Sequence, residues 1–215
     1  MTLNRISVVL ADDHTMVRES LARVLEDSGS VVVIGQANDG RELLDVVERE
    51  KPNCVVLDYS MPNLDGPRAI EKLLTRHRNL KLLVLTVHEN VQYAVRALEA
   101  GAHGYMIKSA AVDELVSAIQ AVFRGETYIS PKVSQDVWAL LRRPKRNREG
   151  LEALSGREFD ALRILAQGAS LQQCADEMKV SVSTVSTYRA RILEKLNLDN
   201  TAELIRFALE RGING

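Results

Sequence analysis

The stretch SVVLADDHTMV (residues 7–17) begins as an apolar run and then sets two carboxylates, Asp12 and Asp13, side by side. A run rich in valine and leucine is typical of a strand that is buried inside a parallel sheet. Two adjacent carboxylates repel each other and are poorly accommodated at the end of such a strand. Their position raises the question of what they hold.

The same alternation of apolar runs and helical patterns continues through the first 124 residues. Apolar runs recur at 31–37, 54–58, 81–86 and 104–107, and amphipathic helical patterns lie at about 15–27, 40–50, 67–77, 91–100 and 112–123. Five units of this kind predict a doubly wound, flavodoxin-like α/β domain with a five-stranded parallel sheet and helices on both faces. In such sheets the ligand site lies at the carboxyl ends of the strands.

Composition indicates an ordinary soluble protein, with 46% hydrophobic and 27% charged residues. No apolar run approaches the roughly 20 residues that a membrane span needs, and the N-terminus lacks the pattern of a secretory signal peptide. Cys54 and Cys174 are too far apart to indicate a metal motif or a disulfide framework. We therefore expect a cytoplasmic protein that has no membrane partner.

Net charge gives no support for nucleic-acid binding. Residues 1–124 carry 14 Lys and Arg against 17 Asp and Glu, and residues 151–215 carry 8 against 9. Basic residues gather only in RRPKRNR (142–148), which we interpret as part of a solvated linker, with a DNA-contacting arm as the alternative. Any DNA-binding surface must therefore be argued from individual residues.

The pattern after Gly125 is helical. A helix is expected at about 131–143, and the polar segment 144–150 after it has no apolar anchor. We therefore predict a first domain over 1–124, a linker over 125–150 that contains this helix, and a second domain over 151–215.

The second domain is predicted to be a small all-α bundle of four helices, at about 156–167, 171–178, 182–196 and 201–211. Three helix starts carry the residues of a capping box, namely Ser155 with Glu158, Ser170 with Gln173 and Asn200 with Glu203. Only three residues separate the second helix from the third, and so tight a turn predicts a helix-turn-helix unit.

More polar residues gather at the carboxyl edge of the predicted sheet. Asp58 closes the strand at 54–58, Thr86 ends the strand at 81–86, and Lys108 follows the strand at 104–107. Three carboxylates at one edge raise one another's pKa unless a cation neutralises them, and oxygen ligands with access to water suit Mg²⁺. Together with an ammonium group and a hydroxyl, they form a receptacle for a phosphoryl group.

Four segments, LADDH, VVLDYSMPNLDG, VLTVH and GYMIKS, resemble the signatures of the receiver domain of two-component response regulators. The resemblance covers residues 5–124. It implies that Asp58 accepts a phosphoryl group from the phosphohistidine of a partner sensor histidine kinase. One departure is Ser109–Ala110, because many receivers place a proline directly after the lysine.

The resemblance also implies roles for the neighbours of Asp58. Asp13, Asp58 and the backbone carbonyl of Ser60 would hold Mg²⁺, with Asp12 acting mainly through water. Lys108 and Thr86 would bind the phosphoryl oxygens, while Tyr105 occupies the switch position. His88, two residues after Thr86, suggests the further hypothesis that its side chain borders the phosphoryl group and tunes its hydrolysis.

Residues 151–212 resemble the LuxR-type output domain, so that the whole chain resembles a NarL/FixJ-type response regulator. The third helix of this domain is then the recognition helix. Its spacing predicts that Val182, Val185, Ile192 and Leu196 pack inward. The residues expected to face DNA are Ser183, Thr184, Ser186, Thr187, Tyr188, Ala190, Arg191 and Lys195.

Two departures weaken direct reading of bases, since family members often carry lysine at the position of Ser186 and histidine at that of Tyr188. DNA affinity is then expected to depend more on dimerisation and on contacts to phosphates. In the last helix, ordinary core packing accounts for Leu204 and Ala208. The other two apolar residues on the same side of that helix, Ile205 and Leu209, are candidates for a dimer contact.

These features predict a transcription regulator that phosphorylation controls, through release of the output domain, dimerisation or both, and that binds promoter DNA as a homodimer. RNA polymerase is a further candidate partner. We expect no enzymatic activity beyond transfer and loss of the protein's own phosphoryl group.

Three other functions are compatible with parts of the sequence. The first is a Mg²⁺-dependent phosphohydrolase, but Ser60 stands where such enzymes carry a second acid. The second is a nucleotide-binding α/β protein, but no G-x-G-x-x-G motif follows the first strand. The third is a constitutive DNA-binding protein with a vestigial receiver, and the intact acidic set argues against it.

Overall fold

The computed structural model describes residues 5–61, 66–109, 112–144 and 148–213. Contacts divide the chain into two compact units, which are described separately. The first comprises residues 1–88 and 94–134, and the second comprises residues 89–93 and 135–215.

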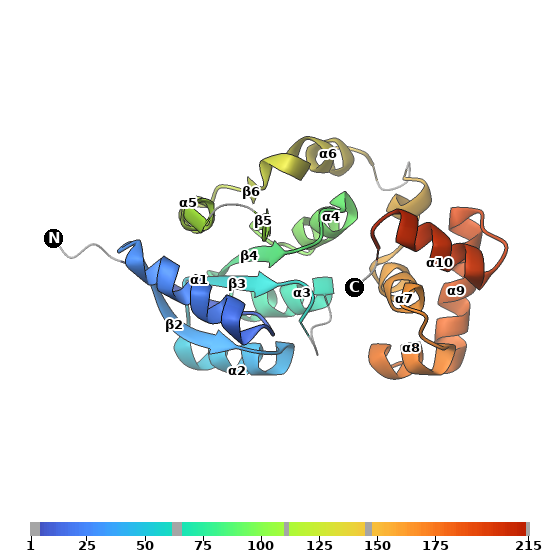
Figure 1. Cartoon of the computed structure of the whole chain (residues 1–215), viewed down its shortest axis with the longest axis horizontal. Coiled ribbons are helices and arrows are strands. Elements are labelled where there is room, and N and C mark those ends of the chain that lie inside the picture. The colour runs from blue at the N-terminus through green and yellow to red at the C-terminus, as the bar shows by residue number, and fades with distance from the viewer. Residues whose placement is uncertain (1–4, 62–65, 110–111, 145–147, 214–215) are drawn as a thin grey trace. The chain divides into compact units, whose positions relative to one another are not determined.

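The first unit is built on one parallel sheet in the order β2-β1-β3-β4-β5-β6 (Figure 1). The strands are β1 (Ile6–Ala11), β2 (Val31–Ala37), β3 (Cys54–Asp58), β4 (Lys81–Thr86), β5 (Gly104–Ile107) and β6 (Tyr128–Ile129). Every residue of β3 is buried, as expected for the central strand of a covered sheet. The doubly wound α/β class is confirmed, and the five strands predicted for residues 1–124 are β1 to β5, while β6 lies in the segment after them. The sixth strand has two residues, too few to give a periodic signal.

Helices cover both faces of this sheet. They are α1 (Thr15–Asp27), α2 (Gly40–Glu50), α3 (Gly66–Arg76), α4 (Val91–Glu99) and α5 (Val112–Phe123). Leu25 of α1 and Ile119 of α5 share one apolar cluster with Val8 of β1. The next residue of β1, Val9, points to the opposite face, where α2 packs closely against Gly35. The carboxyl ends of the strands are thereby left open for a site.

The second unit is helical. Its elements are α6 (Pro131–Leu141), which begins in the first unit, the 3₁₀ turn η2 (Gly150–Ala153), α7 (Gly156–Ala166), α8 (Leu171–Met178), α9 (Val182–Leu196) and α10 (Thr201–Glu210). Lys179 ends α8 in the left-handed conformation, with φ of 53°, and Ser181 caps α9 by accepting the N–H of Thr184. This tight turn between α8 and α9 confirms the helix-turn-helix prediction.

Two of the three predicted capping boxes are confirmed. Ser155 with Glu158 and Ser170 with Gln173 exchange both hydrogen bonds of the motif. At α10 the prediction was wrong in one half. Asn200 accepts the N–H of Glu203, but the Glu203 carboxylate accepts the N–H of Asp199 instead of that of Asn200.

The segment predicted as linker is more structured than expected. It contains β6 and begins η2, and its helix ends at Leu141 rather than at about residue 143. Residues 145–147 of the basic segment, residues 62–65 of the second receiver signature and Ala110 lie outside the described residues. Among the helices of the described ranges, none has the length and apolar character needed to cross a bilayer.

Candidate functional site

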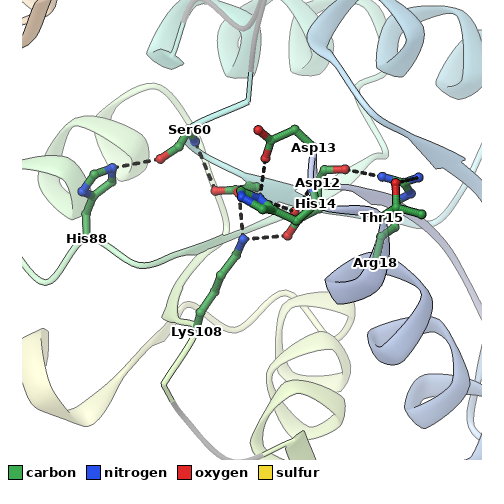
Figure 2. A network of polar contacts seen from close by, with 9 residues as sticks. Asp12, Asp13, His14, Thr15, Arg18, Ser60, His88 and Lys108 are labelled. Atoms are coloured by element: carbon green, nitrogen blue, oxygen red, sulfur yellow. Dashed lines mark hydrogen bonds and ion pairs between the residues drawn. The ribbon is translucent and has the colours of Figure 1, made fainter. Parts of the chain in front are cut away.

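The acidic residues singled out in the sequence lie together at the carboxyl edge of the sheet (Figure 2). Asp58 is the last residue of β3, and Asp12 and Asp13 directly follow β1. One ligand atom from each of these three and one from His14 lie within 4.8 Å of one another. Asp12 and Asp58 are each only 3% exposed. The strand ends therefore bring carboxylates from two strands into one small region.

Lys108 reaches this cluster from the end of β5. Its Nζ lies 2.6 Å from Asp12 Oδ2 and 2.7 Å from Asp58 Oδ2. Burial lowers the pKa of Lys108, but the hydrogen bonds and charges of Asp12 and Asp58 outweigh burial and hold that pKa above its usual value. The lysine therefore supplies a fixed positive charge to both buried carboxylates.

The other oxygen of each carboxylate accepts a backbone N–H two residues further along the chain. Asp12 Oδ1 accepts the N–H of His14 at 2.8 Å, and Asp58 Oδ1 accepts the N–H of Ser60 at 3.1 Å. A carboxylate held at one oxygen by the backbone and at the other by an ammonium group has a defined orientation. His14 Nδ1 also lies 2.8 Å from Asp13 Oδ1, a contact that the sequence did not predict.

The predicted switch residues are connected through His88. Thr86 is fully buried, and its Oγ1 accepts the N–H of His88 at 3.2 Å. Tyr105 is also fully buried, and its hydroxyl donates to the carbonyl of His88 at 2.9 Å. The His88 ring nitrogen Nε2 lies 2.9 Å from Ser60 Oγ (Figure 2). The loop after β4 is therefore hydrogen-bonded both to Tyr105 and to the loop that follows Asp58.

The donor set fits a hard divalent cation. Asp12, Asp13 and Asp58 offer carboxylate oxygens, and no thiolate lies among the ligand atoms of the cluster in the described part of the chain. Mg²⁺ prefers oxygen ligands of this kind and keeps several waters. The hypothesis that His88 borders a phosphoryl group stays a hypothesis, although the contact of its ring with Ser60 brings it close to Asp58.

The predicted recognition helix is α9, and most of its expected DNA-facing residues are accessible. Ser183, Thr187, Ala190, Arg191 and Lys195 are exposed, and the side chains that are half-buried are Thr184, Ser186 and Tyr188. Several hydroxyls already have local partners: Thr184 Oγ1 lies 2.8 Å from Ser181 Oγ, and Thr187 Oγ1 donates to the Ser183 carbonyl at 3.0 Å. Short side chains therefore line the outer surface of this helix.

The inward face of α9 is only partly as predicted. Val185 and Ile192 are fully buried, as the spacing requires. Leu196 is half-buried and Val182 is 37% exposed, so the prediction that both pack inward was wrong for Val182. Val182 is the first residue of the helix and lies one turn before the buried Val185.

Lys195, although exposed, makes contacts within its own domain. Its Nζ lies 2.6 Å from Glu158 Oε2 and donates to the Ala153 carbonyl at 3.1 Å. Glu158 is a residue of α7 that is only 2% exposed. The ammonium group therefore neutralises a buried carboxylate of its own domain, and the expected contact of Lys195 with a DNA phosphate stays a prediction.

The last helix also separates core residues from surface residues. Leu204 and Ala208 are fully buried, in agreement with ordinary core packing. Leu209 is 52% exposed and Ile205 is half-buried. Leu209 thus remains accessible on the side of the helix where the sequence suggested a dimer contact.

Comparison with known proteins matches both halves of the chain. Residues 8–120 match the response regulator receiver domain, and residues 152–208 match the luxR family of bacterial regulatory proteins. The response regulator GacA of Pseudomonas viridiflava is 38% identical over 208 residues, which cover 97% of each protein. The response regulator UvrY of Escherichia coli K12 is 32% identical over 97% of this chain and 95% of its own.

Solved structures agree. RcsB from Salmonella enterica serovar Typhimurium, bound to promoter P1flhDC in the presence of the phosphomimetic BeF₃⁻, has a TM-score of 0.74 and 26% identity, covering 95% of this chain and 98% of its own. The two family matches, the relatives that align over 97% of the chain and the acidic edge of the sheet agree with one another. The chain belongs to the two-component response regulators that join a receiver domain to a LuxR-type DNA-binding domain.

Proposed function

We propose that Asp58 is the phospho-acceptor and that its phosphorylation controls binding of promoter DNA by α9. The observation that carries this proposal is the buried arrangement of Asp58 with Asp12 and Lys108 at the open edge of the sheet. A carboxylate oxygen of Asp58 attacks the phosphorus of a phosphohistidine on a sensor histidine kinase. The P–N bond breaks, a P–O bond forms, and the histidine nitrogen keeps the electron pair.

The residues around Asp58 have separate roles in this transfer. Asp12, Asp13, Asp58 and the Ser60 backbone carbonyl would hold Mg²⁺, which offsets negative charge as the phosphoryl group arrives. Lys108 is already beside the acceptor carboxylate and can pair with a phosphoryl oxygen. The Thr86 hydroxyl can donate a hydrogen bond to another phosphoryl oxygen, because in its contact with the His88 N–H the hydroxyl oxygen is the acceptor and its proton is not used.

The switch follows from these contacts. A phosphoryl group brings about −1.5 to −2 charges and strong acceptor oxygens to the end of β3. When Thr86 and Lys108 move toward it, the loop after β4 moves too, because His88 is hydrogen-bonded to Thr86, Ser60 and Tyr105. Tyr105 then responds to the state of Asp58 through one backbone carbonyl. Phosphorylation can shift the equilibrium between the inactive and active conformations of the receiver only by the difference in free energy with which the phosphoryl group stabilises each of them.

The target of the DNA-binding domain is double-stranded DNA at promoters. The bound promoter in the RcsB structure supports this assignment, because that protein matches 95% of this chain. We assign phosphate contacts to Arg191 and Tyr188, and close approach to the groove to Ser183, Thr184, Ser186, Thr187 and Ala190. We further propose that phosphorylation favours a homodimer, with the exposed Leu209 of α10 as a candidate contact.

The remaining assignments are proposals of the same kind. The receiver is taken as 1–124 and the DNA-binding domain as 151–215, joined by 125–150. The protein would act in the cytoplasm, with RNA polymerase as a further partner at the promoter. It would accept one phosphoryl group per chain without rapid turnover of phosphomonoesters, in contrast to a phosphohydrolase.

The test measures binding of the purified chain to genomic fragments with and without acetyl phosphate and Mg²⁺, beside the Asp58→Ala variant. We expect the phospho-donor to increase the affinity of the wild type and to leave Asp58→Ala unchanged. Equal binding in all samples contradicts control by Asp58.

A further inference from the structure

The short strand β6 lies beside β5, the strand that carries Tyr105. Gly104 pairs with Tyr128 and Tyr105 pairs with Ile129. The N–H of Ser130 donates to the Tyr105 carbonyl at 2.9 Å, which continues the pairing by one residue. Gly104 permits this approach, since a Cβ at that position would lie 3.1 Å from the Tyr128 backbone oxygen. Residues beyond the receiver match of 8–120 thus complete the edge of the sheet.

Ser130 also fixes the point at which the chain leaves β5. Its side chain is buried, with the residue 3% exposed, and Ser130 Oγ accepts the N–H of Ile107 at 3.1 Å. Ile107 is the last residue of β5 and immediately precedes Lys108. A hydroxyl from the segment after the receiver therefore satisfies the backbone at the start of the loop that carries the lysine.

Tyr128 contacts the helix that follows Lys108 in the chain. Its hydroxyl donates to Glu114 Oε1 in the first turn of α5. Burial, and then the bond and charge of Glu114, raise the pKa of Tyr128, so the phenol stays protonated as a donor. Ser130 and Tyr128, which lie two residues apart, thus contact Ile107, directly before Lys108, and Glu114, in the helix after it.

We propose that Ser130 and Tyr128 are positioning residues for Lys108, and that β6 is a working part of the phosphorylation site. This inference rests on the proposed function of Asp58 and Lys108. An ammonium group must lie within hydrogen-bond reach of a phosphoryl oxygen, and holding the adjacent residue Ile107 in place limits the entropy that Lys108 loses there.

The arrangement also connects the end of β5 to the start of α6. The carbonyl of Ser130 accepts the N–H groups of Val133 and Ser134, each at 3.1 Å, and so begins α6. One residue therefore holds the strand that precedes Lys108 with its side chain and starts the linker helix with its carbonyl.

The test compares how fast acetyl phosphate and Mg²⁺ phosphorylate the full-length wild type, Ser130→Ala, Tyr128→Phe and the control Ser134→Ala, which alters a serine of the same segment. We expect Ser130→Ala and Tyr128→Phe to react about tenfold more slowly, at the low end of the effect of other residues that orient a reactive group. Ser134→Ala keeps the wild-type rate. Ser130→Thr, which retains a hydroxyl, restores most of the rate.

A double-mutant cycle separates positioning from a general loss of stability. In a Lys108→Ala background, Ser130→Ala should slow phosphorylation no further, because its effect passes through the lysine. Wild-type rates in Ser130→Ala and Tyr128→Phe overturn the proposal, as does the same slowing with and without Lys108. If the wild type itself takes up no phosphoryl group, the proposed function of Asp58 fails instead.

Discussion

Lys108 Nζ lies 2.7 Å from Asp58 Oδ2 and makes an equally close contact with Asp12. One cation therefore neutralises a carboxylate from each of two strands. Both aspartates are buried, so this charge is little screened by water. A divalent cation bound at this cluster would compete with the lysine ammonium group for the carboxylates, and this competition leads to the first prediction.

Replacing Lys108 with alanine should separate metal binding from phosphorylation. Without the ammonium group, the carboxylates are less neutralised and should bind Mg²⁺ more tightly, by about threefold or more. Phosphorylation should become slower, since the phosphoryl oxygens lose their cationic partner. Metal titration by calorimetry measures the first effect, and acetyl phosphate labelling measures the second. Weaker Mg²⁺ binding in Lys108→Ala would contradict the competition.

Replacing Arg191 with alanine should weaken DNA binding without destabilising the domain. The side chain is exposed on α9 and is assigned to a phosphate. Losing one such contact reduces affinity for all sequences similarly and lowers the slope of log affinity against log salt by about one. Fluorescence anisotropy over a series of salt concentrations provides both quantities. A changed preference among sequences with an unchanged salt slope would instead indicate a contact to a base.

Replacing Lys195 with methionine should destabilise the DNA-binding domain. The change leaves Glu158 as a buried carboxylate without its cation, at a cost of about 1–2 kcal/mol because the lysine itself is partly exposed. Amide hydrogen exchange in α7 and α9 measures the loss for this domain alone. Unchanged protection of these helices would show that the pair contributes nothing to stability.

The same pair predicts a dependence of stability on pH. Burial raises the pKa of Glu158, but the hydrogen bonds from Lys195 and Ser155 lower it more, and the net pKa lies below the usual value. A lowered pKa in the folded state stabilises the domain above the unfolded pKa of about 4.3, and this stabilisation is lost as the pH falls. Protection of α7 should therefore fall more steeply below about pH 5 in the wild type than in Glu158→Gln. Parallel pH profiles for the two proteins would exclude this contribution.

Replacing Gly104 with alanine should disturb β6. The added Cβ would lie 2.7 Å from Leu83 Cδ1, 3.0 Å from Val122 Cγ1 and 3.1 Å from the Tyr128 backbone oxygen. Overpacking of this kind costs about 1–3 kcal/mol. Hydrogen exchange should show reduced protection at the Tyr128 and Ser130 amides, whereas Gly156→Ala, at an open position, should leave both unchanged.

The overall fold could be predicted because long apolar runs and helical patterns alternate without ambiguity. The five longer strands and the helices α7, α8, α9 and α10 lie close to where the sequence patterns predicted them. The strand β6 could not be predicted, since two residues carry no period and their pairing with β5 depends on Gly104, which is distant in sequence. The left-handed Lys179 likewise follows from the tight turn and has no sequence signal of its own.

The site was predictable to the extent that residues at strand ends must meet. Lys108 contacts both Asp12 and Asp58 because the parallel sheet brings its carboxyl ends to one edge. The ion pair of Lys195 with Glu158 could not be predicted, because the two residues are 37 positions apart and no local pattern connects them. The contacts of Ser130 and Tyr128 could not be predicted for the same reason, since their partners belong to β5 and α5.

The central claim, that Asp58 accepts a phosphoryl group, is tested most directly by peptide mass spectrometry of the full chain after incubation with acetyl phosphate and Mg²⁺. We predict a single added mass of about 80 Da on the peptide that contains Asp58, absent when EDTA replaces Mg²⁺ and absent in Asp58→Asn. An unmodified Asp58 peptide, or an equal adduct in Asp58→Asn, would contradict the account.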